Sequence, residues 1–255
     1  SLKTLNAGAD GNNTAVGYRA GTALTTGTQN TLIGSLAGDA LTDTDFNVAV
    51  GVASLSGDTL GSKSTAIGYY ALATQNFTSA TDVFNTAVGH NAGRAVTTGT
   101  GNTLIGGLAG DAITTAANNT ALGFNALGAN TTVGSMTAIG SAALAANTSG
   151  YGSTAVGAAT LDANTTGNLN TAVGQSALGA NTTGTGNASV GANALDANTT
   201  GAYNVAFGLS ALSANTTAGS NVAIGASALE FNTTGASNTA VGTSSLDANT
   251  TGDNL

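Results

Sequence analysis

Residues 170–186 read Asn170-Thr-Ala-Val-Gly174-Gln-Ser-Ala-Leu-Gly-Ala-Asn-Thr-Thr-Gly-Thr-Gly186, and the rest of the chain repeats this unit. Its first phrase, Asn-Thr-Ala-Val-Gly with close variants, occurs fourteen times. Twelve of the thirteen intervals between its glycines are 17 residues, and the remaining one is 21, which predicts a four-residue insertion near Asn76 to Phe84. The motif glycines are Gly17, Gly34, Gly51, Gly68, Gly89, Gly106, Gly123, Gly140, Gly157, Gly174, Gly191, Gly208, Gly225 and Gly242.

The length of the unit selects the fold class. Short stretches suited to β-strands alternate with glycine and Asn-Thr-Thr-Gly turns. Seventeen residues are too few for a helix-pair repeat of about 33 residues, and no helical spacing of apolar residues persists among such frequent glycines. We therefore predict an all-β parallel β-solenoid with about fourteen 17-residue coils and one four-residue insertion. Successive coils should stack about 4.8 Å apart.

Equivalent positions form columns that indicate a shared interior. The residue before the motif glycine is large and apolar in every copy, so we predict that this column fills the core together with leucines four residues after the glycine. Val156, Val173 and Leu178 should then be nearly free of solvent, and Val173→Asp should prevent folding by burying an unpaired charge. Four residues before the glycine, eleven of fourteen copies carry Asn. Such a column can form a hydrogen-bonded ladder.

One pair of columns varies together. Four residues after the motif glycine, ten copies carry Leu and four carry Gly. In those four copies alone, the position three further on is aliphatic; elsewhere it is Asn, except for Asp58 and Gln75. Because protein interiors are close-packed, we expect the second side chain to fill the space left by the first. The pairs are Gly21 with Leu24, Gly38 with Leu41, Gly93 with Val96 and Gly110 with Ile113.

Composition excludes several classes of function. Charged residues are 6% of the chain, against about 25% in an average globular protein. Four Lys and Arg stand against twelve Asp and Glu, for a net charge of −8. Nucleic-acid binding needs clustered basic residues, so we expect no nucleic-acid partner. No apolar run approaches the 18 residues of a membrane-spanning helix, so we expect no membrane insertion. Cysteine is absent, which excludes disulfides and thiolate metal sites.

The residue types that carry catalysis or bind metals are sparse, and we predict no catalytic, cofactor-binding or metal-binding residue. His90 is the single histidine and is interpreted as an exposed loop residue. Carboxylates recur five residues after the motif glycine, where we interpret them as solvated charges that avoid direct stacking. Their positions are Asp39, Asp111, Asp162, Asp196, Glu230 and Asp247.

Two further patterns have structural explanations. The Asp-x-Asp of Asp43 and Asp45 is a weak calcium candidate, because the nonapeptide of calcium-binding rolls is absent. Asn-Thr-Thr tripeptides, from Asn130 to Asn249, match the glycosylation pattern. Their recurrence at the turn register favours a turn-forming role for the Asn side chain instead.

We expect residues 1–11 to form an irregular start or cap and residues 12–255 to form the solenoid, as part of a longer fibre. Two large apolar side chains per coil give a thin core, while columns of alanine and threonine allow another chain to approach closely. This combination favours a homo-oligomer. We expect an apolar axial face, with Asp162, Asp196 and Glu230 at its rim.

The phrases Asn-Thr-Ala-Val-Gly-x-x-Ala-Leu and Asn-Thr-Leu-Ile-Gly-x-Leu-Ala-Gly-Asp-Ala resemble repeats of bacteriophage tail-fibre proteins. They are also similar to the Ser-x-Ala-Ile-Gly head repeats of trimeric autotransporter adhesins, which use a shorter coil. The resemblance covers about residues 12–254. It implies a trimer of parallel β-rolls that serves attachment at a virion or bacterial cell surface.

The leading hypothesis is thus an extracellular structural segment, a stiff rod for attachment, without enzymatic activity. A host-surface glycan or protein receptor is a candidate partner. The alternative is an ice-binding solenoid, although adjacent Thr-Thr pairs point to opposite faces and spaced pairs such as Thr26 and Thr28 are few. A glycan-degrading fibre enzyme is a third hypothesis.

Overall fold

The computed structural model describes residues 11–255, so the expected irregular start at residues 1–11 lies, apart from Gly11, outside the described residues. The regular secondary structure over 11–255 is β-strand, with no helix. The chain divides into two compact units, residues 1–125 and residues 126–255. Each is described by itself.

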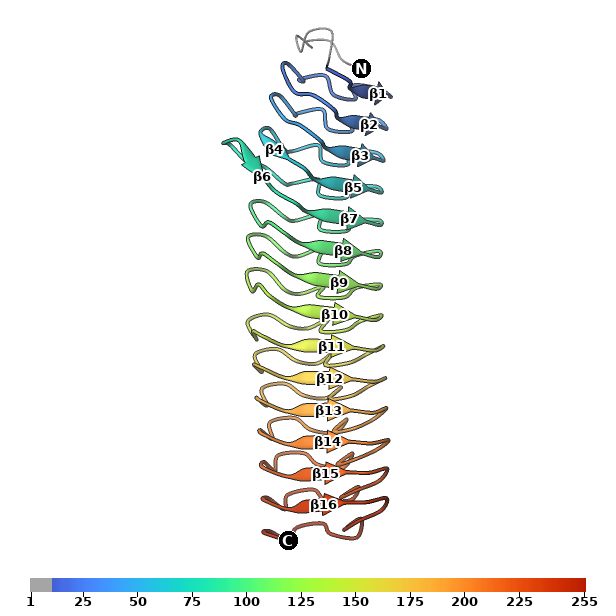
Figure 1. The fold of residues 1–255 in the computed structure, drawn as a ribbon, viewed down its shortest axis with the longest axis vertical. Helices are drawn as coiled ribbons and strands as arrows, with labels where there is room; N and C mark the ends of the chain where they lie inside the picture. The colour runs from blue at the N-terminus through green and yellow to red at the C-terminus, as the bar shows by residue number, and fades with distance from the viewer. Residues whose placement is uncertain (1–10) are drawn as a thin grey trace. The chain divides into compact units, whose positions relative to one another are not determined.

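Both units are parallel β-solenoids in which each coil contributes one three-residue strand (Figure 1). The strands of each unit pair in sequence order, and each pair joins equivalent positions of successive copies, for example Val156 with Val173. The predicted all-β solenoid of 17-residue coils is therefore confirmed. Unit 1 contains β1 (Thr14–Val16), β2 (Thr31–Ile33), β3 (Val48–Val50), β5 (Thr65–Ile67), β7 (Thr86–Val88), β8 (Thr103–Ile105) and β9 (Thr120–Leu122). Unit 2 contains β10 (Thr137–Ile139), β11 (Thr154–Val156), β12 (Thr171–Val173), β13 (Ala188–Val190), β14 (Val205–Phe207), β15 (Val222–Ile224) and β16 (Thr239–Val241).

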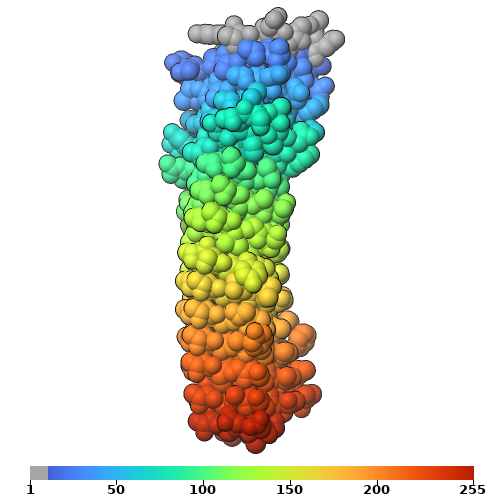
Figure 2. Space-filling model, turned by 90° about the vertical axis from the view of Figure 1, so that its left-hand side faces the viewer, coloured from blue at the N-terminus to red at the C-terminus, as the bar shows by residue number. Residues whose placement is uncertain are grey.

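The insertion lies where it was predicted. Strands β4 (Gly61–Ser62) and β6 (Thr81–Asp82) form a separate two-stranded sheet that projects beside the coils of β5 and β7 (Figure 1). Figure 2 looks onto this side of unit 1, where turquoise side chains of this region face the viewer. The buried carboxylate of Asp58 holds this loop, because it accepts hydrogen bonds from the backbone N–H of Phe77 at 3.0 Å and from the Gln75 amide at 2.6 Å. Asp58 and Gln75, the two exceptions in their column, thus anchor the inserted residues.

The prediction for the core is half wrong. Leu178 is fully buried, but Val173 is 37% exposed and Val156 is partly exposed. Side chains alternate across a strand, and the inward position is the alanine two residues before the motif glycine, such as Ala155 or Ala172. In coils with a buried turn leucine such as Leu178, that leucine and the asparagine side chains leave room only for a small side chain there. Leu32 and Leu104 occupy the position in coils that lack the turn leucine. Aliphatic side chains before the glycine therefore face outward.

The predicted exchange between glycine and aliphatic side chains is confirmed. Leu24, Leu41, Val96 and Ile113 are all fully buried. A Cβ placed on Gly38 would lie 2.7 Å from Leu41 Cδ1 and 2.8 Å from Leu32 Cδ2. Both leucines therefore use the space that a leucine at position 38 would otherwise occupy.

Asparagines hold the coils together from inside, as the ladder prediction stated. Asn187 Oδ1 accepts the backbone N–H of Asn204 at 2.9 Å, and the pattern recurs along this column. In unit 2 a second asparagine column, from Asn130 onward, completes the interior. Its Asn181 donates to the Gly184 carbonyl at 3.1 Å, and Asn170 of the first column donates to the same carbonyl at 2.8 Å. Two amides thus satisfy one buried carbonyl, and the same arrangement recurs at Gly201, Ala218 and Gly235, which removes the cost of burying these carbonyls unpaired.

Candidate functional site

The side chains that face outward from the strands form a flat surface on each unit, which we call the open sheet face. It consists of the residues three before and one before each motif glycine. Five of these aliphatic or aromatic side chains in unit 2 are among the exposed large hydrophobic residues of the chain, and Phe207 is 57% exposed. The others are Val173, Val205, Ile224 and Val241.

The open sheet face carries no charged residue in either unit over residues 11–255. The column three residues before the motif glycine holds Thr, Val or Ala, and the column one residue before it holds Val, Ile, Leu or Phe. In unit 2, Leu209 at the corner after the strand is exposed as well. Exposed apolar surfaces are typical of interaction sites. A face free of carboxylates was expected from the sequence, but its residues were not, because the residues before the motif glycines were placed in the core.

Carboxylates lie away from that face, in the turn five residues after the motif glycine. Asp162 and Asp196 are two coils apart, with Gly179 between them at the same register. Burial raises the pKa of Asp162 above its ordinary value of 3.8, and the backbone N–H groups of Asp162 and Ala163 offset only part of the effect. Burial likewise raises the pKa of Asp196. Both carboxylates are half-buried, and neither belongs to an ion pair within residues 11–255.

The raised pKa values give a pH-dependent prediction. An acid whose pKa is higher when folded destabilises the fold while ionised, so the penalty is complete at neutral pH and disappears below the unfolded value of about 3.8. Asp162→Asn and Asp196→Asn should therefore raise the melting temperature at pH 7, and the gain should vanish as the pH falls to that value. Asp253→Asn is the control, because Asp253 accepts the Ala236 N–H at 2.6 Å and its replacement should not stabilise. Melting curves of the three variants between pH 3 and pH 8 provide the measurement; a gain that persists at pH 3 would contradict the explanation.

The Asn-Thr-Thr asparagines have the structural role that was predicted. Asn164, Asn181 and Asn198 are fully buried, and each donates its side-chain amide to the carbonyl three residues later. The following threonine also bonds between coils, as Thr182 Oγ1 donates to the Thr199 carbonyl at 3.0 Å. An amide enclosed in this way is inaccessible to a glycosylating enzyme in the folded chain.

The calcium candidate uses its carboxylates for contacts between coils. Asp43 Oδ1 accepts the Thr26 hydroxyl at 2.6 Å. Asp45 Oδ1 accepts the N–H of Thr28 at 2.7 Å and its hydroxyl at 2.8 Å. Over the described part of the chain, no group of three or more His, Cys, Asp or Glu side chains is placed to hold a metal ion.

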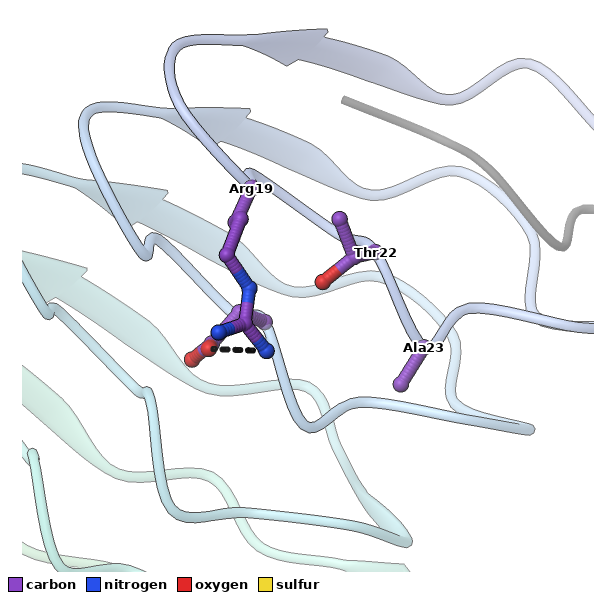
Figure 3. A pocket seen from close by; sticks show the side chains of 4 residues that line it. Arg19, Thr22 and Ala23 are labelled. Atoms are coloured by element: carbon purple, nitrogen blue, oxygen red, sulfur yellow. Dashed lines mark ion pairs between the residues drawn. The ribbon is translucent and has the colours of Figure 1, made fainter.

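The other notable side chains lie at the corner that follows each strand. His90 is exposed, and its ring stacks on that of Tyr69. At the same corner of the first coils, Arg19, Thr22, Ala23 and Asp39 line an open hollow of about 490 Å³ (Figure 3). Arg19 and Asp39 form an ion pair of 3.9 Å across it. Burial raises the pKa of Asp39, and the Arg19 charge opposes that shift.

Comparison with protein families, curated proteins and solved structures finds no match to this chain. Residues 11–255 contain no helix long and apolar enough to cross a membrane. The chain is a β-solenoid repeat protein whose open sheet face is uncharged, with one column mostly of threonine and one of large apolar side chains.

Proposed function

We propose that this chain is a structural segment of an extracellular attachment fibre, of a virion or a bacterial cell surface, and that it works as a homo-oligomer, with three chains favoured. The observation that carries the proposal is the open sheet face. Uncharged aliphatic side chains occupy it in every described coil, whereas isolated soluble proteins rarely leave such a surface uncovered.

The distribution of charge supports parallel chains that meet through this face. Each chain has a net charge of −8, so association is favoured only where carboxylates are absent from the contact. Asp162 and Asp196 stand in the turns rather than on the strands. Flat apolar columns pack closely across an axis, and the resemblance to trimeric fibre and adhesin repeats makes three chains the favoured number.

Charged substitutions on the face test the proposal. Val173→Asp combined with Ile224→Asp should reduce the mass in solution from about three times 24.1 kDa to that of one chain, because carboxylates would be desolvated and would repel one another at the contact. Thr166→Asp with Thr217→Asp, at exposed turn positions, is the matched control and should keep the native mass. Light scattering after size-exclusion chromatography measures both. A native chain that is itself a monomer at micromolar concentration would overturn the proposal.

Ice binding is the second candidate, and one observation favours it. Threonine and an aliphatic residue, two positions apart, both face outward in ten described coils, as with Thr171 and Val173. Strand geometry sets a regular array, about 6.7 Å along the strand and about 4.8 Å between coils. The adjacent Thr-Thr pairs, by contrast, bond between coils. A monomer that shows thermal hysteresis would favour this function over the fibre.

A non-enzymatic role is part of the proposal. The hollow at Arg19 contains one carboxylate, Asp39, which is already paired with a cation. Glycoside hydrolysis uses two carboxyl groups about 5–9.5 Å apart across a cleft. Incubation with bacterial surface polysaccharide, followed by an assay for reducing ends, should show no release.

A further inference from the structure

Aromatic rings gather at one corner of unit 1, where the chain leaves strands β5 and β7. Tyr69 and Tyr70 follow the motif glycine of one coil, and His90 follows that of the next. The Tyr69 and His90 rings are stacked, with centroids 5.3 Å apart and planes inclined by 7°. Tyr70 meets Tyr69 edge-on at a centroid distance of 4.4 Å. Tyr69 remains 49% exposed, so the group presents a ring to solvent.

Polar groups complete a small hollow beside these rings. Asn91 and Arg94, with Tyr69 and Tyr70, line a space of about 230 Å³. The Arg94 guanidinium lies 5.8 Å from the centre of the Tyr70 ring, within the range of a cation–π contact. Pockets that enclose drug-sized molecules measure about 300–1,000 Å³. This hollow is therefore suited to one small ring whose substituents extend into solvent.

The fold does not require these side chains. The chain contains five tyrosines, one histidine and four lysines and arginines in total. Two of the tyrosines, the histidine and one arginine meet at this corner. In unit 2 the position of Tyr69 is alanine in three coils, at Ala158, Ala192 and Ala226, and it is never aromatic. Packing of the coils thus accepts a methyl group here, and the gathering of rings is a local addition to the repeat.

We propose that this hollow binds one pyranose ring of a neutral glycan. A pyranose presents C–H bonds on one face, which lie favourably against the electron-rich face of an aromatic ring. Its hydroxyl groups pair with the planar donors of Arg94 and with the Asn91 amide, which both donates and accepts. The Tyr69 ring, which His90 supports by stacking, supplies the apolar platform, and Asn91 and Arg94 supply the polar edge.

A nucleobase also stacks on aromatic rings, but single-stranded nucleic acid needs a basic groove for its phosphates. Arg94 is the cation at this hollow, and its charge acts on nearby Asp111. The chain carries a net charge of −8. A neutral sugar is therefore favoured. The assignment deepens the attachment role proposed above, but it concerns a different surface and does not depend on how many chains associate.

Saturation-transfer NMR on the full chain tests the assignment. The probes are the methyl glycosides of glucose, galactose, mannose and N-acetylglucosamine. At least one should receive saturation at its ring C–H protons and shift the Hε1 resonance of His90, which needs no assignment because the chain has one histidine. Tyr69→Ala should weaken that binding about tenfold. Tyr203→Ala, which removes a more exposed tyrosine from unit 2, should leave it unchanged.

Each other outcome overturns the assignment. Absence of saturation transfer to all four glycosides, or equal binding by the Tyr69→Ala variant with an unchanged circular dichroism spectrum, would remove the sugar site. Tighter binding of a thymidine oligonucleotide than of any glycoside would reassign the platform to nucleobases. None of these results alters the solution mass, so failure here is distinguishable from failure of the fibre proposal.

Discussion

Gly174→Ala is expected to lower the free energy of unfolding by at least about 3 kcal/mol. Gly174 has a φ angle of +134°, which side-chain-bearing residues rarely adopt, and a Cβ there would lie 2.5 Å from the carbonyl oxygen of Gly191. That oxygen belongs to the backbone of the next coil, so neither partner can move without breaking the stack. Urea denaturation followed by circular dichroism measures the loss.

The matched control is five residues along the same coil. Gly179 has no positive φ, and a Cβ on it would meet its nearest neighbour, the Ser176 carbonyl oxygen, at 3.3 Å. Gly179→Ala should therefore change the free energy of unfolding by less than about 1 kcal/mol. Equal losses for the two variants would show that the motif glycine is not required by close approach of the coils.

Introducing a carboxylate at two adjacent strand positions is expected to have opposite effects on folding. Ala172→Asp should abolish the folded state, because Ala172 is fully buried and a carboxylate there would be unpaired, at a cost of several kcal/mol. Val173→Asp should keep the solenoid, because Val173 faces outward. Far-UV circular dichroism and melting curves of both variants decide the matter. A folded Ala172→Asp beside an unfolded Val173→Asp would reverse the inward and outward sides of the strand.

The period of the repeat allowed most of the fold to be predicted. Identical spacing specifies identical coils, so the parallel register, the insertion near Asn76 to Phe84 and the asparagine ladder all followed from the sequence. The exchange between Gly38 and Leu41 was also predictable, because two positions that vary together occupy one space. All of these features follow from comparing equivalent positions of the repeat, and that comparison needs only the sequence.

The direction of the strand side chains was not predicted correctly. Because side chains alternate along a strand, either the middle residue or the two outer residues of a three-residue strand can face the interior. Hydrophobicity alone favours Val173 over Ala172 as the inner residue. A better signal was the range of side-chain sizes in each column. The column one residue before the motif glycine accepts Phe207, which no narrow interior would hold. Leu32 and Leu104, the two leucines in the alanine column, occur in coils with Gly38 and Gly110. That pairing indicates that the alanine column faces the interior.

The candidate sites depended on contacts between coils that spacing does not reveal. His90 was correctly predicted to be exposed, but its stacking on Tyr69 depends on the rotation of both rings. A face free of carboxylates was expected, but the residues of the open sheet face were not identified, because the inward and outward sides of the strands were exchanged. Asp58 was noted as an exception in its column, yet its three-donor environment arises from the inserted loop and required the structure.

Thiol labelling tests most directly whether the open sheet face is where chains meet. The chain has no cysteine, so Val173→Cys and Thr166→Cys each introduce a single thiol, one on the face and one on an exposed turn of the neighbouring coil. If chains meet through this face, a water-soluble maleimide at micromolar protein concentration should react rapidly with the thiol at position 166. The thiol at position 173 should react slowly until dilution separates the chains. Equally fast labelling at both positions in the undiluted protein would show that the face is open to solvent and would contradict the account.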